Sequence, residues 1–373
     1  MPIKVDNITR NNPRYRDLFH RNVTAIVLDS SSYAWGWGAN AYGNIGNNTI
    51  SGQSSPTSVV GGKQWLKITN GGYITAAIDP NSYAWVWGYN GSGSLGVNAT
   101  ANRSSPVSVI GGKQWVTIAA GGDFTLALDS NSYAWAWGSN SSGQLGYNST
   151  TRRSSPISVI GGKQWIAITA GPDHSGALDS NSYAWCWGQN AFGQLGNNSN
   201  VTRSSPVSVN GNKQWQKLGM NASGGYNTFA LDSNSYAWAW GQNSNSFGNS
   251  ILSNVSSPTL ITMGKQWVDI DLSNYFGVGV DGSFVGWSWG SNIGGQLGVG
   301  TTTDSNAPTK ISGMLFQKLQ AGNETASGLT NTLFLFGWGN NSGFGIVGDG
   351  TGENRSYPAM NVRRGVLTKI FGK

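Results

Sequence analysis

The chain alternates short apolar runs with clusters of glycine, asparagine, serine and aspartate, and this pattern recurs with a period of about 50 residues. A repeat of this length predicts a fold in which one supersecondary unit is copied many times. A Trp-Gly pair marks each copy, at Trp37, Trp87, Trp137, Trp187, Trp240, Trp289 and Trp338.

The third copy shows most clearly which elements the unit contains. Residues 115–119 and 125–128 are rich in β-branched or aromatic side chains, and residues 133–137 alternate large and small ones as in a pleated strand. The sequence Asp129-Ser130-Asn131 between the second and third runs is typical of a turn. Residues 156–159 begin with a proline, which favours an edge strand. We therefore predict an all-β fold, a seven-bladed β-propeller of four-stranded blades.

The two ends of the chain both contain the start of a repeat. Residues 15–29 align without gaps on residues 65–79, so the first blade has its own first strand. Residues 366–370 match the same strand again, and either copy is able to complete the ring. We predict a basic N-terminal arm at 1–14, the propeller at 15–362, and a basic C-terminal strand at 363–373.

The motif Trp-Gly-x-Asn-x-x-Gly-x-Leu-Gly at residues 137–146 carries a family resemblance, together with the following Ser-Pro-x-x-Val and a later Ala-Leu-Asp. This order resembles the repeat of the regulator of chromosome condensation propellers, and it covers residues 15–370. The resemblance implies a propeller, including the type encoded by phages and bacteria. It does not imply nucleotide exchange activity, because no blade carries the inserted wedge on which that activity depends in the family.

The charge is concentrated at the termini. The formal net charge is +7, yet the excess of lysine and arginine lies in residues 1–21 and 355–373, and the body between them is close to neutral. A ring brings its ends together, so these charges are expected in one neighbourhood. Two interpretations remain open: solvated tails, or a patch that anchors the propeller on an anionic partner. The anchoring candidates are Arg10, Arg14, Arg16, Arg363, Arg364 and Lys369.

The 18 tryptophans and the single cysteine are best explained by packing. Every tryptophan falls on a repeat position, as expected for contacts made once per blade interface. Cys186 stands between two of them and is expected to be a small buried side chain. The two histidines, His20 and His174, lack the neighbouring carboxylates of a metal site. We predict no catalytic site, no metal and no cofactor, and the sequence contains no run of about 18 apolar residues that would indicate a membrane span.

Two loops vary among the repeats while the strands stay nearly identical. One loop follows Trp-Gly and the other precedes the second strand. Individually adapted binding loops would give this pattern, and so would neutral drift. Tyrosine among asparagine, serine and glycine is also the composition of adaptable binding loops. The binding candidates are Tyr42, Tyr73, Tyr89, Phe124, Tyr147, His174, Phe192, Tyr226, Tyr275 and Phe344.

These observations predict a non-enzymatic structural and recognition module. The favoured hypothesis is a phage protein on the virion surface, attached to other virion proteins through its basic termini and displaying its loops to a host surface. The alternative is a free cytoplasmic scaffold for protein–protein interaction. Nucleic acid is not expected as a partner, since the excess charge is confined to the termini.

Overall fold

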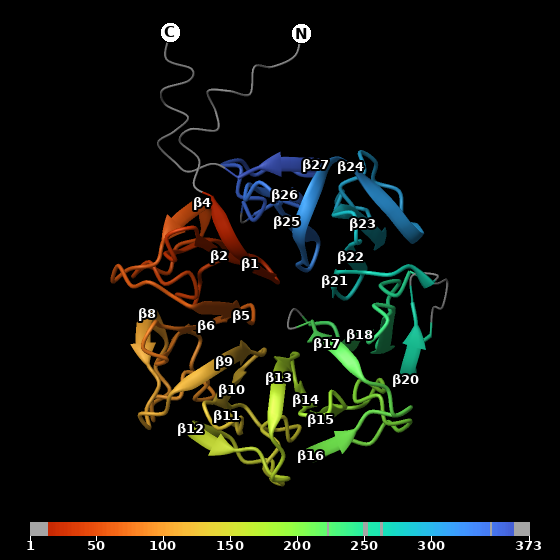
Figure 1. The fold of residues 1–373 in the computed structure, drawn as a ribbon. Helices are drawn as coiled ribbons and strands as arrows, with labels where there is room; N and C mark the ends of the chain where they lie inside the picture. Colours follow the sequence, from red (N-terminus) through yellow and green to blue (C-terminus); the bar gives the residue numbers. More distant parts are fainter. Residues whose placement is uncertain (1–13, 222–223, 249–252, 262–263, 344, 362–373) are drawn as a thin grey trace, which may run out of the picture.

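The computed structural model describes residues 14–361, except for residues 222–223, 249–252, 262–263 and 344. The described residues form 27 β-strands, grouped in antiparallel sheets around a central opening (Figure 1). In each four-stranded sheet the first strand lies beside the opening and later strands lie progressively further out (Figure 1). The prediction of an all-β propeller is confirmed.

Five sheets have four strands each, in sequence order from inside to outside. The strands predicted in the third repeat are confirmed there, with small shifts at their ends. The first sheet contains β1 (Tyr15–Arg21), β2 (Thr24–Asp29), β3 (Ala34–Gly38) and β4 (Gln53–Ser58); the second β5 (Lys67–Asn70), β6 (Ile74–Ile78), β7 (Ala84–Gly88) and β8 (Arg103–Ser108); the third β9 (Trp115–Ala120), β10 (Phe124–Asp129), β11 (Ala134–Gly138) and β12 (Arg153–Ser158); the fourth β13 (Trp165–Ala170), β14 (His174–Asp179), β15 (Ala184–Gly188) and β16 (Arg203–Ser208); the fifth β17 (Trp215–Met220), β18 (Asn227–Asp232), β19 (Ala237–Gly241) and β20 (Val255–Leu260).

The sixth sheet has seven strands, so the prediction of seven four-stranded blades is wrong. Five blades have four strands, and one continuous sheet completes the ring. Its central strand pairs with β23 through its first part and with β25 through its last part. The strands are β21 (Asp269–Leu272), β22 (Phe276–Val280), β23 (Val285–Gly290), β24 (Ser305–Ala321), β25 (Thr325–Thr330), β26 (Leu335–Gly339) and β27 (Arg355–Met360).

The connection inside β24 differs locally from the one before β9, although β20 and the separate strand β21 are also joined through a segment with a single glycine, Gly264. Between β8 and β9 the chain turns at Gly111 and Gly112, which have φ values of +100° and +60° that favour glycine. The corresponding part of β24 has one such residue, Gly313, at +89°. Leu315 then pairs with Val285, and the strand continues into its pairing with β25. A repeat count therefore does not fix the number of separate sheets.

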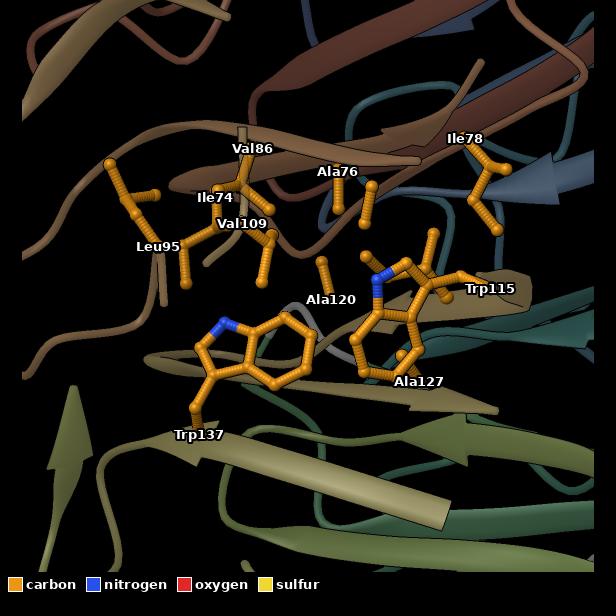
Figure 2. Close-up of a cluster of buried hydrophobic side chains, with 12 residues drawn as sticks. Ile74, Ala76, Ile78, Val86, Leu95, Val109, Trp115, Ala120, Ala127 and Trp137 are labelled. Atoms are coloured by element: carbon orange, nitrogen blue, oxygen red, sulfur yellow. The ribbon is translucent and has the colours of Figure 1, made fainter. Parts of the chain in front are cut away.

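The hydrophobic core lies between neighbouring sheets. Figure 2 shows the cluster between the second and third sheets, where Ile74 and Val86 face Trp137 and Trp115. Each of the seven Trp-Gly tryptophans is fully buried, and most donate their Nε1–H to a backbone carbonyl of the preceding repeat, as Trp187 does to Gln144 at 2.9 Å. The predicted packing role of the tryptophans is confirmed, and Cys186 is fully buried in the same kind of cluster.

Close packing also explains one repeated glycine. Gly146 ends the Gly-x-Leu-Gly motif with φ of +71°, and a Cβ there would lie 2.6 Å from Nε1 of Trp187. A side chain at this position would therefore push the tryptophan of the next sheet out of its site.

The antiparallel connections give the ring two distinct faces. In the third repeat Phe124 pairs with Gly138, so the hairpin before β10 and the long loop after β11 lie at one end of the sheet. We call this the loop face. Asp129 pairs with Trp115 at the other end, where β10 turns into β11 and β12 leads on to β13. We call this the turn face. Both variable loops of every repeat therefore belong to the loop face.

Both ends of the described chain lie on the turn face. Tyr15 pairs with Asp29 at the turn end of the first sheet, which confirms that β1 is the first strand of this blade. Met360 pairs with Phe336 at the turn end of the sixth sheet. The proposed C-terminal strand at 366–370 lies outside the described residues, and its role in closure stays a prediction.

Candidate binding face

The long loops of the loop face are held by a buried asparagine. Asn140 accepts the Leu145 backbone N–H at 2.9 Å and donates to the carbonyl oxygens of Ser149 and Thr151 at 2.8 and 2.9 Å. Leu145 is fully buried, so the loop is fastened to the core at this point. The other asparagines with this pattern of hydrogen bonds are Asn40, Asn90, Asn190, Asn292 and Asn341. The variable side chains therefore stand on fixed loops.

Three of the predicted tyrosines meet in one cluster between the first and second sheets. The ring of Tyr42 lies 5.3 Å from that of Tyr73 and 5.1 Å from that of Tyr89, in edge-to-face geometry. Tyr42 and Tyr73 are exposed and Tyr89 is half-buried. A cluster of this kind presents aromatic edges and hydroxyl groups together, which suits contact with a protein surface.

A second cluster joins the fourth and fifth sheets. Phe192 and Tyr226 are stacked, with ring centroids 5.5 Å apart, and the Tyr226 hydroxyl donates to Asp173 at 3.5 Å. Gln144 also donates to Asp173, at 3.3 Å. Burial raises the pKa of Asp173 above its ordinary value. Burial also raises the pKa of Asp123, and the charge of Asp173 raises it further. The two carboxyl groups therefore interact with each other on the loop face.

The sequence analysis did not identify this acidic pair. The sequence does contain a signal for this pair, because Asp123 and Asp173 stand at the hairpin position that Tyr73 and Tyr226 occupy in other repeats. That position faces the loop of the preceding repeat, as the contacts of Asp173 and Tyr226 show. The same position therefore supplies aromatic side chains in some blades and carboxyl groups in others.

The comparison with protein families identifies the chain. The family model described as RCC1-like domain matches residues 21–315. The chain belongs to the RCC1-like domain family. The resemblance of the Trp-Gly repeat to these propellers is confirmed.

Solved structures of RCC1-like proteins share the fold. Yeast RCC1 (Prp20), in its crystal structure with Kap60, matches with a TM-score of 0.78 and 18% identity over 93% of this chain and 86% of that one. Human WBSCR16 matches with a TM-score of 0.74 and 18% identity, over 84% and 85% of the two chains. A second structure, of Prp20p from Saccharomyces cerevisiae, has a TM-score of 0.71 and 19% identity over 83% and 80%. At these identities the matches show the fold alone.

Two predicted loop residues of this RCC1-like chain lie in its interior. Phe124 and His174 are fully buried at the starts of β10 and β14. Each begins the second strand of its sheet, where side chains point between neighbouring sheets. His174 shares a hydrogen bond of 3.0 Å with the Thr228 hydroxyl of the next sheet. These two residues are therefore structural, and the residues one position earlier in each hairpin, Asp123 and Asp173, are half-buried.

The remaining candidates are spread over the molecule. Tyr147 is half-buried on the loop face, where its hydroxyl donates to the carbonyl of Thr151. Tyr275 is exposed on a hairpin of the sixth sheet, on the same face. Arg14 and Arg16 are exposed at the start of β1, on the turn face. Five candidates lie outside the described residues: Arg10, Phe344, Arg363, Arg364 and Lys369.

The described ranges contain neither a candidate metal-binding group nor a candidate membrane-spanning helix. Across those residues no three His, Cys, Asp or Glu side chains gather in a group suited to a metal ion. The same part of the chain has no helix with the length and apolar character needed to cross a bilayer.

Proposed function

We propose that this RCC1-like propeller is a non-enzymatic recognition module with two working faces. The turn face attaches the ring to a larger assembly, and the loop face recognises a protein surface. The observation that carries the proposal is the division of the molecule: both ends of the described chain lie on the turn face, and both variable loops lie on the other. Protein partners are named for relatives of this fold, namely Kap60, Gsp1p and histones for yeast RCC1 (Prp20).

The assembly we propose is a virus particle. The repeats are nearly identical, poor in charge and rich in asparagine and serine, like those of the propellers that phages and bacteria encode. In this proposal the basic terminal segments and the turn face bind other virion proteins, and the tyrosine cluster and the Phe192–Tyr226 pair meet the host surface. The rival function is a free intracellular scaffold with one protein partner.

Gradient fractionation of the native protein tests this proposal. We expect the chain to sediment with intact particles, as followed by mass spectrometry of the fractions. The double variant Tyr42→Ser/Tyr89→Ser is expected to remain on the particle but to reduce particle binding to host cells by about tenfold, because hot-spot aromatics contribute much of the energy of such contacts. A wild-type chain that runs only as a free species would overturn the virion assignment.

A further inference from the structure

A β-bulge at the start of the inner strands turns one side chain per repeat out to solvent. In the third and fourth sheets the register shifts between Trp115 and Thr117 and between Trp165 and Ala167, so Val116 and Ile166 are the extra residues. Bulges commonly re-aim a side chain in this way. Val116 is 53% exposed and Ile166 is 56% exposed, and Leu66 at the same sequence position of the second repeat is 53% exposed. All three lie on the turn face, next to the central opening.

The fold does not require apolar residues at these positions. The bulge carries Gln216 in the fifth sheet, Gln317 in the β24–β25 part of the sixth and Arg16 in the first, whereas the residue before β21 is the apolar Val268, which stands apart from the other three. Leu66, Val116 and Ile166 stand on β5, β9 and β13 or directly before them, and these inner strands contact one another in that order. The apolar side chains thus form an arc over three consecutive sheets instead of a complete ring.

A second apolar position follows the same arc. Ile110 and Ile160, in the connections that lead to β9 and β13, are 39% and 40% exposed. The next repeat has Asn210 at this position. We call Leu66, Val116, Ile166, Ile110 and Ile160 the apolar arc. Apolar residues grouped on one part of a repeated surface are typical of an interaction site.

The charge beside the apolar arc is positive. The Nζ atoms of Lys63, Lys113 and Lys163 lie 4.0, 3.7 and 3.9 Å from the centres of the Trp85, Trp135 and Trp185 rings. Within the described ranges none of these lysines forms an ion pair. The rings hold the ammonium groups at the surface, where they remain available to a partner.

The nearby aspartates accept hydrogen bonds within the fold. In the third repeat Asp129 accepts the backbone N–H groups of Asn131 and Tyr133 at 2.9 and 3.0 Å and the Trp135 indole N–H at 2.9 Å. The second and fourth repeats have the same arrangement, and all three aspartates are buried. In the sixth repeat the equivalent Lys265 and Asp281 form an ion pair at 3.2 Å, whereas the described residues show no such pair at Lys63, Lys113 or Lys163.

We propose that the apolar arc is the docking site for an acidic, apolar segment of a partner protein. Its apolar side chains cover Leu66, Val116 and Ile166, and its carboxylates pair with Lys63, Lys113 and Lys163. This rests on the proposed function, because the arc lies on the face through which we propose that the ring attaches. It names the chemistry of that contact: desolvation of apolar side chains supplies affinity, and the lysine row orients the segment.

Binding of a synthetic peptide to the purified full chain tests the docking site. The probe is a labelled peptide of about 16 residues with Leu on one face of a helix and Glu on the other, followed by fluorescence anisotropy. We expect Leu66→Gln/Val116→Gln/Ile166→Gln to weaken binding by at least about tenfold. Glutamine is the right replacement because Gln216 and Gln317 show that the bulge accepts it.

Matched variants make the result specific. Val268 is 53% exposed at the corresponding position of the sixth sheet, outside the arc, so Val268→Gln is expected to leave binding unchanged. Lys63→Gln/Lys113→Gln/Lys163→Gln is expected to weaken binding at low salt and to remove most of its salt dependence. An all-Glu peptide and a Leu/Lys peptide are expected to bind much more weakly than the probe.

Several results would overturn the docking site. Equal binding by the wild type and the triple glutamine variant would do so. So would a self-associated wild-type chain that the triple glutamine variant makes monomeric, or a DNA duplex that competes with the peptide and binds more tightly. The docking site and the attachment proposal fail in different ways. A chain that sediments with particles but does not bind the peptide refutes the docking site alone. A free chain that binds the peptide refutes the virion assignment alone.

Discussion

At the scale of single residues, burial changes the pKa values of the two histidines. His20 shares hydrogen bonds with the hydroxyl groups of Ser327 and Thr325 at 2.7 and 3.0 Å, and His174 is buried against Thr228. The pKa of each imidazole is lowered from 6.5 to about 3, mainly by burial, and for His20 the neighbouring Arg21 charge contributes to the same shift. Both side chains therefore remain neutral in the folded protein at acidic pH.

This burial predicts a loss of stability in acid. Between pH 6.5 and about 3 the unfolded chain binds protons that the folded chain does not, so the free energy of unfolding falls as pH falls through this window. Each histidine contributes a slope of roughly 1.4 kcal/mol per pH unit well below pH 6.5. We expect His20→Gln/His174→Gln to flatten the pH dependence, as measured by urea unfolding at several pH values.

The acidic pair on the loop face gives stability the opposite dependence on pH. The raised pKa values of Asp123 and Asp173 mean that the folded chain binds more protons than the unfolded chain just above pH 3.8, so their contribution to stability declines as pH rises. The wild-type curve therefore contains both effects, and the difference between wild type and the histidine variant isolates the first. Parallel curves for the two proteins would contradict the histidine assignment.

At the scale of elements, two residues at the turn between the second and third strands differ together when one repeat of the chain is compared with another. In the third repeat the Asp129 carboxylate accepts the Trp135 indole N–H at 2.9 Å and two backbone N–H groups. The last repeat has Thr330 and Phe336 at these positions, and the Thr330 hydroxyl accepts the Phe334 N–H at 3.1 Å. The carboxylate and the indole are thus both absent there.

This pairing predicts the outcome of a double-mutant cycle. We expect Asp129→Thr to lower the free energy of unfolding by about 1.5–3 kcal/mol, because hydrogen bonds to a charged group are lost and the Trp135 N–H loses its acceptor. Asp129→Thr/Trp135→Phe is expected to be less destabilised than the sum of the single variants. Urea unfolding followed by circular dichroism measures all four proteins. Additive single effects would show that the indole and carboxylate do not act as a unit.

The same elements show how far the sequence predicts the fold. The Asp129 turn, the third strand that follows it and the core role of Trp137 were all predicted, because each depends on local residue chemistry repeated in nearly every unit. The continuous strand β24 was not predicted. The connection there has one glycine, Gly313, as does the connection before the separate strand β21, so neither the period nor the glycine count predicts whether the chain bends or stays extended.

The candidate site was harder to predict than the fold. The tyrosines Tyr42 and Tyr73 were identified as loop residues, but their contact depends on how neighbouring sheets align. Phe124 was assigned to the surface because a hairpin tip and the first residue of the next strand are adjacent in sequence, although only one of them points to solvent. The apolar arc was not identified either, since the sequence pattern places Val116 inside an ordinary strand and does not show the bulge.

At the scale of the whole molecule, the first and sixth sheets close the ring through side chains. The Arg21 guanidinium forms a two-point ion pair with Asp271, with distances of 2.6 and 3.2 Å, and also donates to Gln320 at 3.2 Å. Asp271 in turn accepts the Ala321 backbone N–H at 2.9 Å. Arg21 from β1 therefore contacts both β21 and β24 of the sixth sheet.

The Arg21–Asp271 pair is buried, which decides the effect of breaking it. The Asp271 side chain is 1% exposed and that of Arg21 is 14% exposed. Arg21→Met would leave a buried carboxylate without its cation, and we expect the free energy of unfolding to fall by roughly 3–5 kcal/mol. Arg21→Met/Asp271→Asn removes both charges and is expected to recover a large part of that loss. Tryptophan fluorescence during urea unfolding measures each variant.

A second ion pair between inner strands provides the matched control. Lys217 and Asp269 join the fifth and sixth sheets, but their side chains are 33% and 20% exposed. Lys217→Gln is therefore expected to cost less than about 1 kcal/mol, because water replaces the lost partner. If both single variants were equally mild, burial would not distinguish the two pairs and Arg21 would not close the ring. A large loss for Arg21→Met alone would show that the buried pair stabilises the junction at which the first and last sheets meet, because the exposed pair at the neighbouring junction has no such effect.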